Sequence, residues 1–355
     1  MNIDVSAIIE RQKLSRFLVS LIVVSWLITF FDGFDTNLIS FAAPYLASEY
    51  HLDRIQLGNI FSIGLVGTLI GGLLLGYALS AFILLAMLPE SIRFLASKGQ
   101  RPDRIRVIVG RIAPDEPVAA GATFVVGDED TGSKDFKPSL LFRGELRFIT
   151  PMIWTAYVAS SFAVFFIVNW TPLVFEALHY TRVEAASVSS LNSLMGAFGG
   201  VLLMRFTDKR GAIAITIMPF ITALLLLFAG FVDIGHASFL VLNVLISGFL
   251  IGGHFGMISI CGLFYPSAYR ANGAGWATSI AKIGSIAGPI TGGFVLSTSL
   301  PVRNIFGVLA ICPAIFAVCI YFVGRIHRRM LDRETLVAEN IAMPSVLYSS
   351  RKAQR

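Results

Sequence analysis

Residues 303–324 read RNIFGVLAICPAIFAVCIYFVG, an apolar run in which Arg303 is the only charged side chain. A helix needs about 20 mainly apolar residues to cross the hydrocarbon core of a bilayer. Runs of similar length and composition recur along the chain. We therefore predict eight membrane-spanning helices, near 17–43, 56–77, 150–175, 185–205, 212–232, 238–262, 273–297 and 303–324.

The composition also points to lipid as the solvent of this chain. Of its 355 residues, 55% are hydrophobic and 14% are charged, whereas soluble domains are typically about 25% charged. The net charge of +6 would suit a nucleic-acid-binding protein, but the Lys and Arg residues lie mainly between the apolar runs. We predict an all-α polytopic membrane protein that binds no nucleic acid.

The distribution of basic residues predicts the orientation in the membrane. Segment 93–147 contains ten Lys and Arg residues, whereas the turn at 233–238 contains none. Basic loops stay on the cytoplasmic side. We therefore expect a multi-pass protein of the plasma (inner) membrane with both termini in the cytoplasm. Gly, Pro, Asp and Ser dominate much of 98–147, which predicts a mostly flexible cytoplasmic linker between two halves.

Two acids lie inside the first apolar run, in the stretch Asp32-Gly33-Phe34-Asp35. Residues at i and i+3 share one face of a helix. An acid within the membrane is costly, so it usually faces a cavity and often serves proton or ion coupling. We favour a coupling role for Asp32 and Asp35. The alternative is that both lie near the interface and are simply solvated.

Three further polar residues in apolar runs are candidate site residues. Lys282 can attract an anionic substrate or pair with an acid, or it can snorkel to the interface. His254 can carry a proton or contact a substrate, but a lone histidine more often makes a helix–helix hydrogen bond. Asn169 is a candidate for lining a cavity. We assign Trp170 to an interfacial belt and expect Pro172 to break or kink its helix.

Glycines recur at four-residue spacing, which lets helix backbones approach closely. The sequence contains no Walker-type phosphate loop, HExxH, paired CxxC or GxSxG. Its three cysteines form no disulfide framework or metal site. We expect no enzyme activity, no catalytic residues, no cofactor and no metal. The glycine pairs are Gly67 and Gly71, Gly72 and Gly76, Gly196 and Gly200, Gly248 and Gly252, and Gly284 and Gly288.

One apolar run, 57–88, is too long for a single span. As a helix it would measure about 48 Å, against a hydrocarbon core of about 30 Å. Either the helix breaks near Gly76-Tyr77, or 78–88 lies along the interface.

Several stretches together carry a resemblance to a known family. The most specific are Asp32-Gly33-Phe34-Asp35 and YPSAYRANGAGW at 265–276, supported by LGNIFSIG at 57–64, LPESIRFL at 88–95 and GSIAGP at 284–289. The chain resembles the aromatic acid:proton symporters of the major facilitator superfamily, of the 4-hydroxybenzoate/benzoate transporter kind. The resemblance covers nearly the whole chain before its tail.

The resemblance implies a fold of twelve helices in two six-helix halves, and proton-coupled uptake of aromatic carboxylates such as 4-hydroxybenzoate. Asp32 and Asp35 match the acidic motif of the family's first helix. Asp208, followed by Lys209 and Arg210, matches the gating loop between its eighth and ninth helices.

This sequence departs from the family pattern in three places. Lys282 stands where we expect Arg, and His254 stands where we expect Gln. After Tyr77 the chain lacks the basic gating loop, helices three to five and most of helix six, which explains the overlong run. We therefore predict the following parts: a truncated N-terminal half at 1–97 with about two spans, the linker at 98–147, a complete six-helix half at 148–326, and a cytoplasmic tail at 327–355.

The expected function is symport of an aromatic acid with protons. Asp32 and Asp35 would take the proton, Lys282 would draw the carboxylate, and His254 and Asn169 would line the site. The alternative is a non-transporting membrane protein derived from such a transporter, or one that needs a partner chain to complete its N-terminal half.

Overall fold

The computed structural model describes residues 2–4, 19–20, 23, 38–75, 95, 102–112, 123–125, 136–210, 212–260, 264–265, 269–298 and 300–330. The chain forms two compact units. One contains 1–39 and 66–135, and the other contains 40–65 and 136–355.

The first unit contains a short parallel pairing and an amphipathic helix. Strand β1 (Asn2–Asp4) pairs with β2 (Thr123–Val125), and Ile3 lies opposite Phe124. Helix α6 (Pro102–Ile112) buries Ile105, Ile108 and Val109 on one face. A helix therefore lies within a segment for which composition predicted a mostly flexible linker, because the apolar spacing at 105, 108, 109 and 112 is helical.

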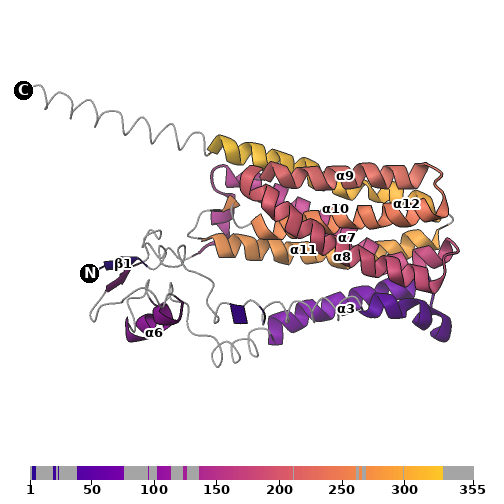
Figure 1. Cartoon of the computed structure of the whole chain (residues 1–355), viewed down its shortest axis with the longest axis horizontal. Helices are drawn as coiled ribbons and strands as arrows, with labels where there is room; N and C mark the ends of the chain where they lie inside the picture. Colours follow the sequence, from indigo (N-terminus) through magenta and orange to yellow (C-terminus); the bar gives the residue numbers. More distant parts are fainter. Residues whose placement is uncertain are drawn as a thin grey trace, which may run out of the picture. The chain divides into compact units, whose positions relative to one another are not determined.

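The second unit is a bundle of long helices that run side by side (Figure 1). A short 3-10 helix, η2 (Pro138–Phe142), precedes the bundle. A helix at 38–50, from Ser40 onward, and the first half of α3 (Arg54–Leu75) also belong to this unit. The bundle comprises α7 (Leu146–Ala177), α8 (Arg182–Arg210), α9 (Ala212–Phe231), α10 (His236–Ile260), α11 (Arg270–Ser297), α12 (Val302–Leu309) and a continuing helix at 311–330.

Six helices of the described part are long and apolar enough to cross a membrane: Arg54–Gly71, Leu146–Ala177, Arg182–Leu203, His236–Ile258, Arg270–Ser297 and Arg303–Met330. A shorter apolar helix covers Ile215–Phe231. These helices correspond to seven of the eight predicted spans and confirm the all-α polytopic class. The predicted span at 17–43 lies mostly outside the described residues.

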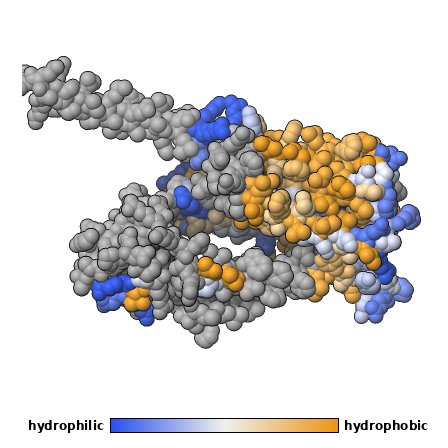
Figure 2. Space-filling view, in the orientation of Figure 1, coloured by the Kyte–Doolittle hydropathy of each residue, from blue (hydrophilic) through white to orange (hydrophobic). Residues whose placement is uncertain are grey.

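The outer surface of the bundle matches a lipid environment. Hydrophobic residues cover it in one broad band, and hydrophilic residues gather at its ends (Figure 2). Large apolar side chains such as Leu194, Phe231 and Phe294 are more than 60% exposed. Such exposure is unusual in water over so wide an area but is expected of helix faces that contact lipid.

Glycines bring the helices of this bundle together. A Cβ atom added at Gly284 would lie 2.1 Å from the Val158 carbonyl oxygen of α7, and one at Gly288 would lie 2.6 Å from the Phe162 oxygen. Between α8 and α10, a Cβ at Gly252 would lie 2.8 Å from the carbonyl carbon of Gly199. Close backbone approach is therefore confirmed for α7 with α11 and for α8 with α10.

The other predicted glycine pairs have mixed outcomes. Gly196 and Gly200 of α8 face Ile251 and Phe255 of α10 at short range. At Gly67 and Gly71 of α3 an added Cβ atom would meet nothing within 4 Å among the described residues, so the predicted close approach is not found at this pair. Gly72 and Gly76 stay a prediction, because Gly76 lies outside the described residues.

A buried amide pair also joins α8 to α10. The Nδ2 atom of Asn192 donates a hydrogen bond of 2.9 Å to Oδ1 of Asn243, and both side chains are buried. A buried amide without a partner costs free energy, so each Asn favours the position of the other.

Polar contacts join the segments that connect the helices at one end of the bundle. The Tyr180 hydroxyl donates to the main-chain oxygen of His236 at 2.9 Å, and the two rings stack. Burial raises the pKa of Tyr180, which keeps this hydroxyl a neutral donor. Arg303 pairs with Asp233 across the next turn. Helix α8 starts with a capping box, in which Thr181 and Glu184 exchange hydrogen bonds.

Candidate functional site

Three helices bring polar side chains to one level of the bundle. On α7, residues 158–162 lie against Gly284 of α11. Within the same stretch, Ser160 shares a hydrogen bond of 2.8 Å with Nδ1 of His254 on α10. Ser160 is fully buried and His254 is 9% exposed. The candidate site is the part of the bundle at this depth along the helix axes, called the Ser160 level below. Here α7 lies between the polar groups of α10 and α11.

Aromatic side chains surround the histidine. Tyr157 lies one turn before Ser160 on α7, and its ring meets the His254 ring edge-on at 6.0 Å between centroids. The Phe255 ring lies 6.2 Å from the same imidazole. Tyr157 and Met257 belong to one buried hydrophobic cluster of the bundle, together with Ala281 of α11. The imidazole is thus held in an apolar, aromatic setting that suits a planar ring.

Lys282 lies beside this level on α11. It follows the buried Ala281 and precedes Gly284, which contacts α7. Its side chain is half-buried. Among the residues that the structure describes, no carboxylate forms a salt bridge with Lys282. A positive charge within an apolar bundle attracts anions.

His254 makes the helix–helix hydrogen bond that sequence reasoning left open as the alternative. This bond uses Nδ1, and no hydrogen bond within the described part of the chain reaches the other ring nitrogen, which can bond to a ligand. The Ser160 and Tyr157 contacts were not predicted. A serine in an apolar run commonly bonds to its own helix, and nothing in the sequence shows that this one faces α10.

Asn169 is placed away from this level. It lies nine residues beyond Ser160 on α7, a rise of about 13 Å. Its Oδ1 atom accepts a hydrogen bond of 2.9 Å from Ser40, and its Nδ2 atom donates to the Phe165 carbonyl oxygen at 2.7 Å. Asn169 therefore joins α7 to the helix at 38–50. The structure does not bring it together with His254 and Lys282.

The assignment of Trp170 to an interfacial belt was wrong. The side chain is 1% exposed, and its Nε1 atom donates a hydrogen bond of 3.1 Å to the Pro289 carbonyl oxygen of α11. Its ring also meets the Phe61 ring edge-on. An indole enters a membrane core when its N–H finds an acceptor there. Pro172 does not end its helix, because α7 continues to Ala177.

The remaining predicted site residues are less fully described. Asp32 and Asp35 lie outside the described residues, as does the junction after Tyr77. The backbone of Asp208, Lys209 and Arg210 forms the last turn of α8, and only residue 211 separates it from α9. The segment predicted as a gating loop is thus helical up to Arg210, and its gating role stays a prediction.

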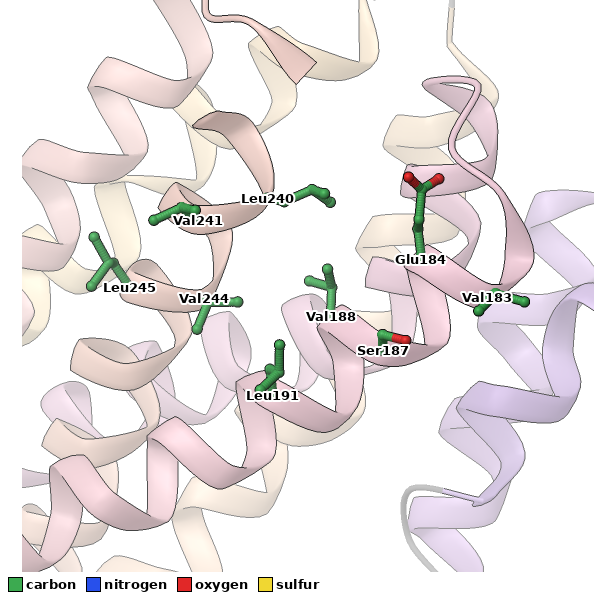
Figure 3. A pocket seen from close by; sticks show the side chains of 9 residues that line it. All are labelled: Val183, Glu184, Ser187, Val188, Leu191, Leu240, Val241, Val244 and Leu245. Carbon is green, nitrogen blue, oxygen red and sulfur yellow. The ribbon is translucent and has the colours of Figure 1, made fainter. Parts of the chain in front are cut away.

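A separate cavity of about 400 Å³ lies between α8 and α10 (Figure 3). Val188 and Leu191 line it from α8, and Val244 lines it from α10. Glu184 is the only charged residue of its lining. This cavity contains none of the predicted site residues, and its apolar walls and acidic residue do not suit a carboxylate ligand.

Comparison with known proteins places the second half of the chain in one family. Residues 153–344 match the family model described as Major Facilitator Superfamily. The match covers more than half of the 355 residues.

Curated relatives extend the similarity over most of the chain. The 4-hydroxybenzoate transporter PcaK of Pseudomonas putida is 22% identical over 431 residues, covering 91% of this chain and 96% of that protein. The gallate transporter of Pseudomonas putida is also 22% identical, with coverage of 92% and 96%. The benzoate transport protein of Acinetobacter baylyi is 26% identical over 71% of this chain and 54% of its own length.

Proposed function

The chain belongs to the Major Facilitator Superfamily, and from this premise we propose that it carries aromatic carboxylates, such as 4-hydroxybenzoate, across the membrane together with protons. Membrane transport itself follows from the family and from the six apolar helices. The substrate class is supported by the relatives, which are named for 4-hydroxybenzoate, gallate and benzoate.

One observation carries the proposal: the half-buried Lys282 lies at the same level of the bundle as the buried, aromatic-lined imidazole of His254. Lys282 supplies the charge that attracts a carboxylate, and Tyr157 and His254 supply flat surfaces for a ring. An acid that enters this level would gain an ion pair in a medium of low dielectric constant, where such a pair is strong. Lys282 is therefore proposed to bind the substrate carboxylate.

The proton is assigned to the first apolar run. Asp32 and Asp35 share a helix face in the predicted span at 17–43, and acids at such positions commonly exchange protons in transporters. Proton coupling, the plasma-membrane location and the cytoplasmic termini all belong to this proposal. Asn169 remains in it as a residue that fixes α7, because both ends of its amide are already bonded.

The proposal includes a shortened N-terminal half. The alignment with the 4-hydroxybenzoate transporter runs over 431 residues, whereas this chain has 355 residues. The relative therefore has residues without a counterpart here, which supports an internal deletion. We place it after Tyr77, where the overlong apolar run joins two segments that resemble non-adjacent parts of the family. In transporters of this kind the substrate lies between the two halves, so a partner chain that completes the missing half would restore the second wall of the substrate site.

The function is tested by uptake of labelled 4-hydroxybenzoate in cells that lack their own transporter for it. We expect accumulation that a proton uncoupler abolishes. Lys282→Gln should reduce this uptake at least tenfold, and the matched variant Lys282→Arg should retain it, because Arg keeps the charge and adds a bidentate fork for a carboxylate.

The opposing result is also clear. If the protein reaches the membrane but accumulates neither 4-hydroxybenzoate, gallate nor benzoate, the proposed activity is wrong for this chain alone. Uptake that appears only on co-expression with a second membrane protein would show that a partner chain is required.

A further inference from the structure

We propose that Ser160 is a positioning residue that fixes the orientation of the His254 imidazole. In this orientation its Nε2 atom forms a hydrogen bond with the ring hydroxyl of a hydroxylated aromatic acid. The inference rests on the proposed function and specifies its substrate class. The hydrogen bond from His254 to the ring hydroxyl would make the site selective for hydroxybenzoates over benzoate.

The first step is the hydrogen bond itself. Ser160 on α7 and His254 on α10 are joined at 2.8 Å through Oγ and Nδ1, although 94 positions separate them in the sequence. Ser160 is fully buried, so water does not replace this partner. Within the described part of the chain, no other hydrogen bond reaches the His254 ring. The bond therefore determines which ring nitrogen faces α7 and which faces away.

The second step is the orientation of the ring. The terminal torsion of a histidine side chain has broad energy wells, so packing alone defines it poorly. Tyr157 meets the ring edge-on and Phe255 lies beside it, and neither contact distinguishes Nδ1 from Nε2. Ser160 does distinguish them. In a neutral imidazole one nitrogen donates and the other accepts, and a serine hydroxyl can do either. The Ser160 bond therefore fixes the position of Nε2 and leaves both roles open to that atom.

The third step is the position of the cation. Gly284 contacts Val158 of α7, two residues before Ser160, and Lys282 lies two residues before Gly284 on α11. Lys282 and His254 thus reach the same level from different helices. In the proposed binding mode, the carboxylate of a substrate ring pairs with Lys282 and a hydroxyl at the other end of the ring bonds to His254. A ring without the hydroxyl can pair only with Lys282.

The chemistry predicts a selective effect of Ser160. Removing its hydroxyl frees the imidazole to turn, which weakens the contact with a ring hydroxyl but not the ion pair with Lys282. A neutral hydrogen bond contributes about 1 kcal/mol, which corresponds to a roughly fivefold change in affinity. Affinity for benzoate should stay unchanged because benzoate makes no such bond.

The test compares KM and maximal rate for 4-hydroxybenzoate and benzoate in the full chain. We expect Ser160→Ala to raise KM for 4-hydroxybenzoate about fivefold and to leave KM for benzoate within twofold. Ser161→Ala is the matched control, since Ser161 is a similarly buried neighbour on α7, and within the described residues the His254 ring bonds to Ser160 and not to Ser161. It should leave both values unchanged. Ser160→Thr keeps the hydroxyl and should retain the preference for 4-hydroxybenzoate.

A double variant shows whether Ser160 acts through the histidine. His254→Phe keeps a ring of similar size but removes both nitrogens, and it should abolish the preference for the hydroxylated acid. Adding Ser160→Ala to His254→Phe should then change the ratio of the two KM values no further. A further change in that ratio would overturn the proposal.

The remaining outcomes are equally decisive. A similar loss of affinity for both acids in Ser160→Ala, or no loss for either, overturns the positioning role while the transport function stands. If the unmodified chain transports neither acid, the proposed function fails and this inference fails with it. The wild-type uptake assay therefore separates the two failures.

Discussion

Gly284 lies where α11 approaches α7 closely, and replacing it with alanine tests how tightly this interface is packed. An added Cβ atom would lie 2.1 Å from the Val158 carbonyl oxygen and 3.0 Å from the Phe162 nitrogen. Both are main-chain atoms, so no side-chain rotation relieves the clash. The first distance would have to grow by about 1.3 Å to reach 3.4 Å, where ordinary van der Waals contact begins.

The size of the effect follows from this displacement. Inserting a methyl group into a well-packed core costs about 1–3 kcal/mol, and a clash with backbone belongs at the upper end of that range. For a domain of about 200 residues, a loss of about 2–3 kcal/mol lowers the thermal midpoint by roughly 4–12 °C. Lys282 and the Ser160 level lie beside the contact, so we also expect weaker uptake of 4-hydroxybenzoate.

The assay is thermal unfolding of the purified protein in one detergent. The control variant is Gly275→Ala on the same helix, where an added Cβ meets nothing within 4 Å. It should be neutral or stabilising by up to about 1 kcal/mol, because alanine favours a helix over glycine. If Gly284→Ala and Gly275→Ala unfold at the same temperature, the close packing of α7 on α11 is refuted.

Three further perturbations address other contacts. Asn192→Ala should destabilise the protein by about 1–2 kcal/mol in denaturant titrations, because it leaves the buried Asn243 amide without its bond. The double variant with Asn243→Ala should lose less stability than the two single variants added together, and strict additivity would contradict the pair. Trp170→Phe should cost about 1 kcal/mol in the same titration through loss of the bond to Pro289, and an unchanged midpoint would contradict this. Asp32→Asn should remove uncoupler-sensitive accumulation, and intact proton-coupled uptake would rule out its coupling role.

The helices of this chain could be predicted well because one property decides them. An apolar run of about 20 residues has few alternatives to a membrane helix. The predicted span at 150–175 differs from α7 only at its ends, which extend from Leu146 to Ala177. Helix α6 was missed for the opposite reason. Its surroundings are rich in Gly, Pro and Asp, and only the spacing of Ile105, Ile108 and Val109 indicates a helix.

The candidate site could be predicted only in part. Lys282 and His254 were found because a polar group in an apolar run is rare and costly. Ser160 was missed because its importance depends on the distance between α7 and α10, which local sequence does not encode. Trp170 shows the same limit. Its type favours the membrane interface, but the Pro289 carbonyl oxygen of a different helix offers a buried partner.

The first half of α3 docks on α11 through contacts that end on main-chain oxygens. Arg54 donates to the Leu296 oxygen, and Ser62 donates to the Ile286 oxygen at 2.9 Å. A Cβ at Gly58 would lie 2.7 Å from the Pro289 oxygen. Every helix offers such oxygens whatever its side chains. Substitutions on this face of α11 can therefore accumulate over evolutionary time without releasing α3, provided that they stay small enough to preserve the approach.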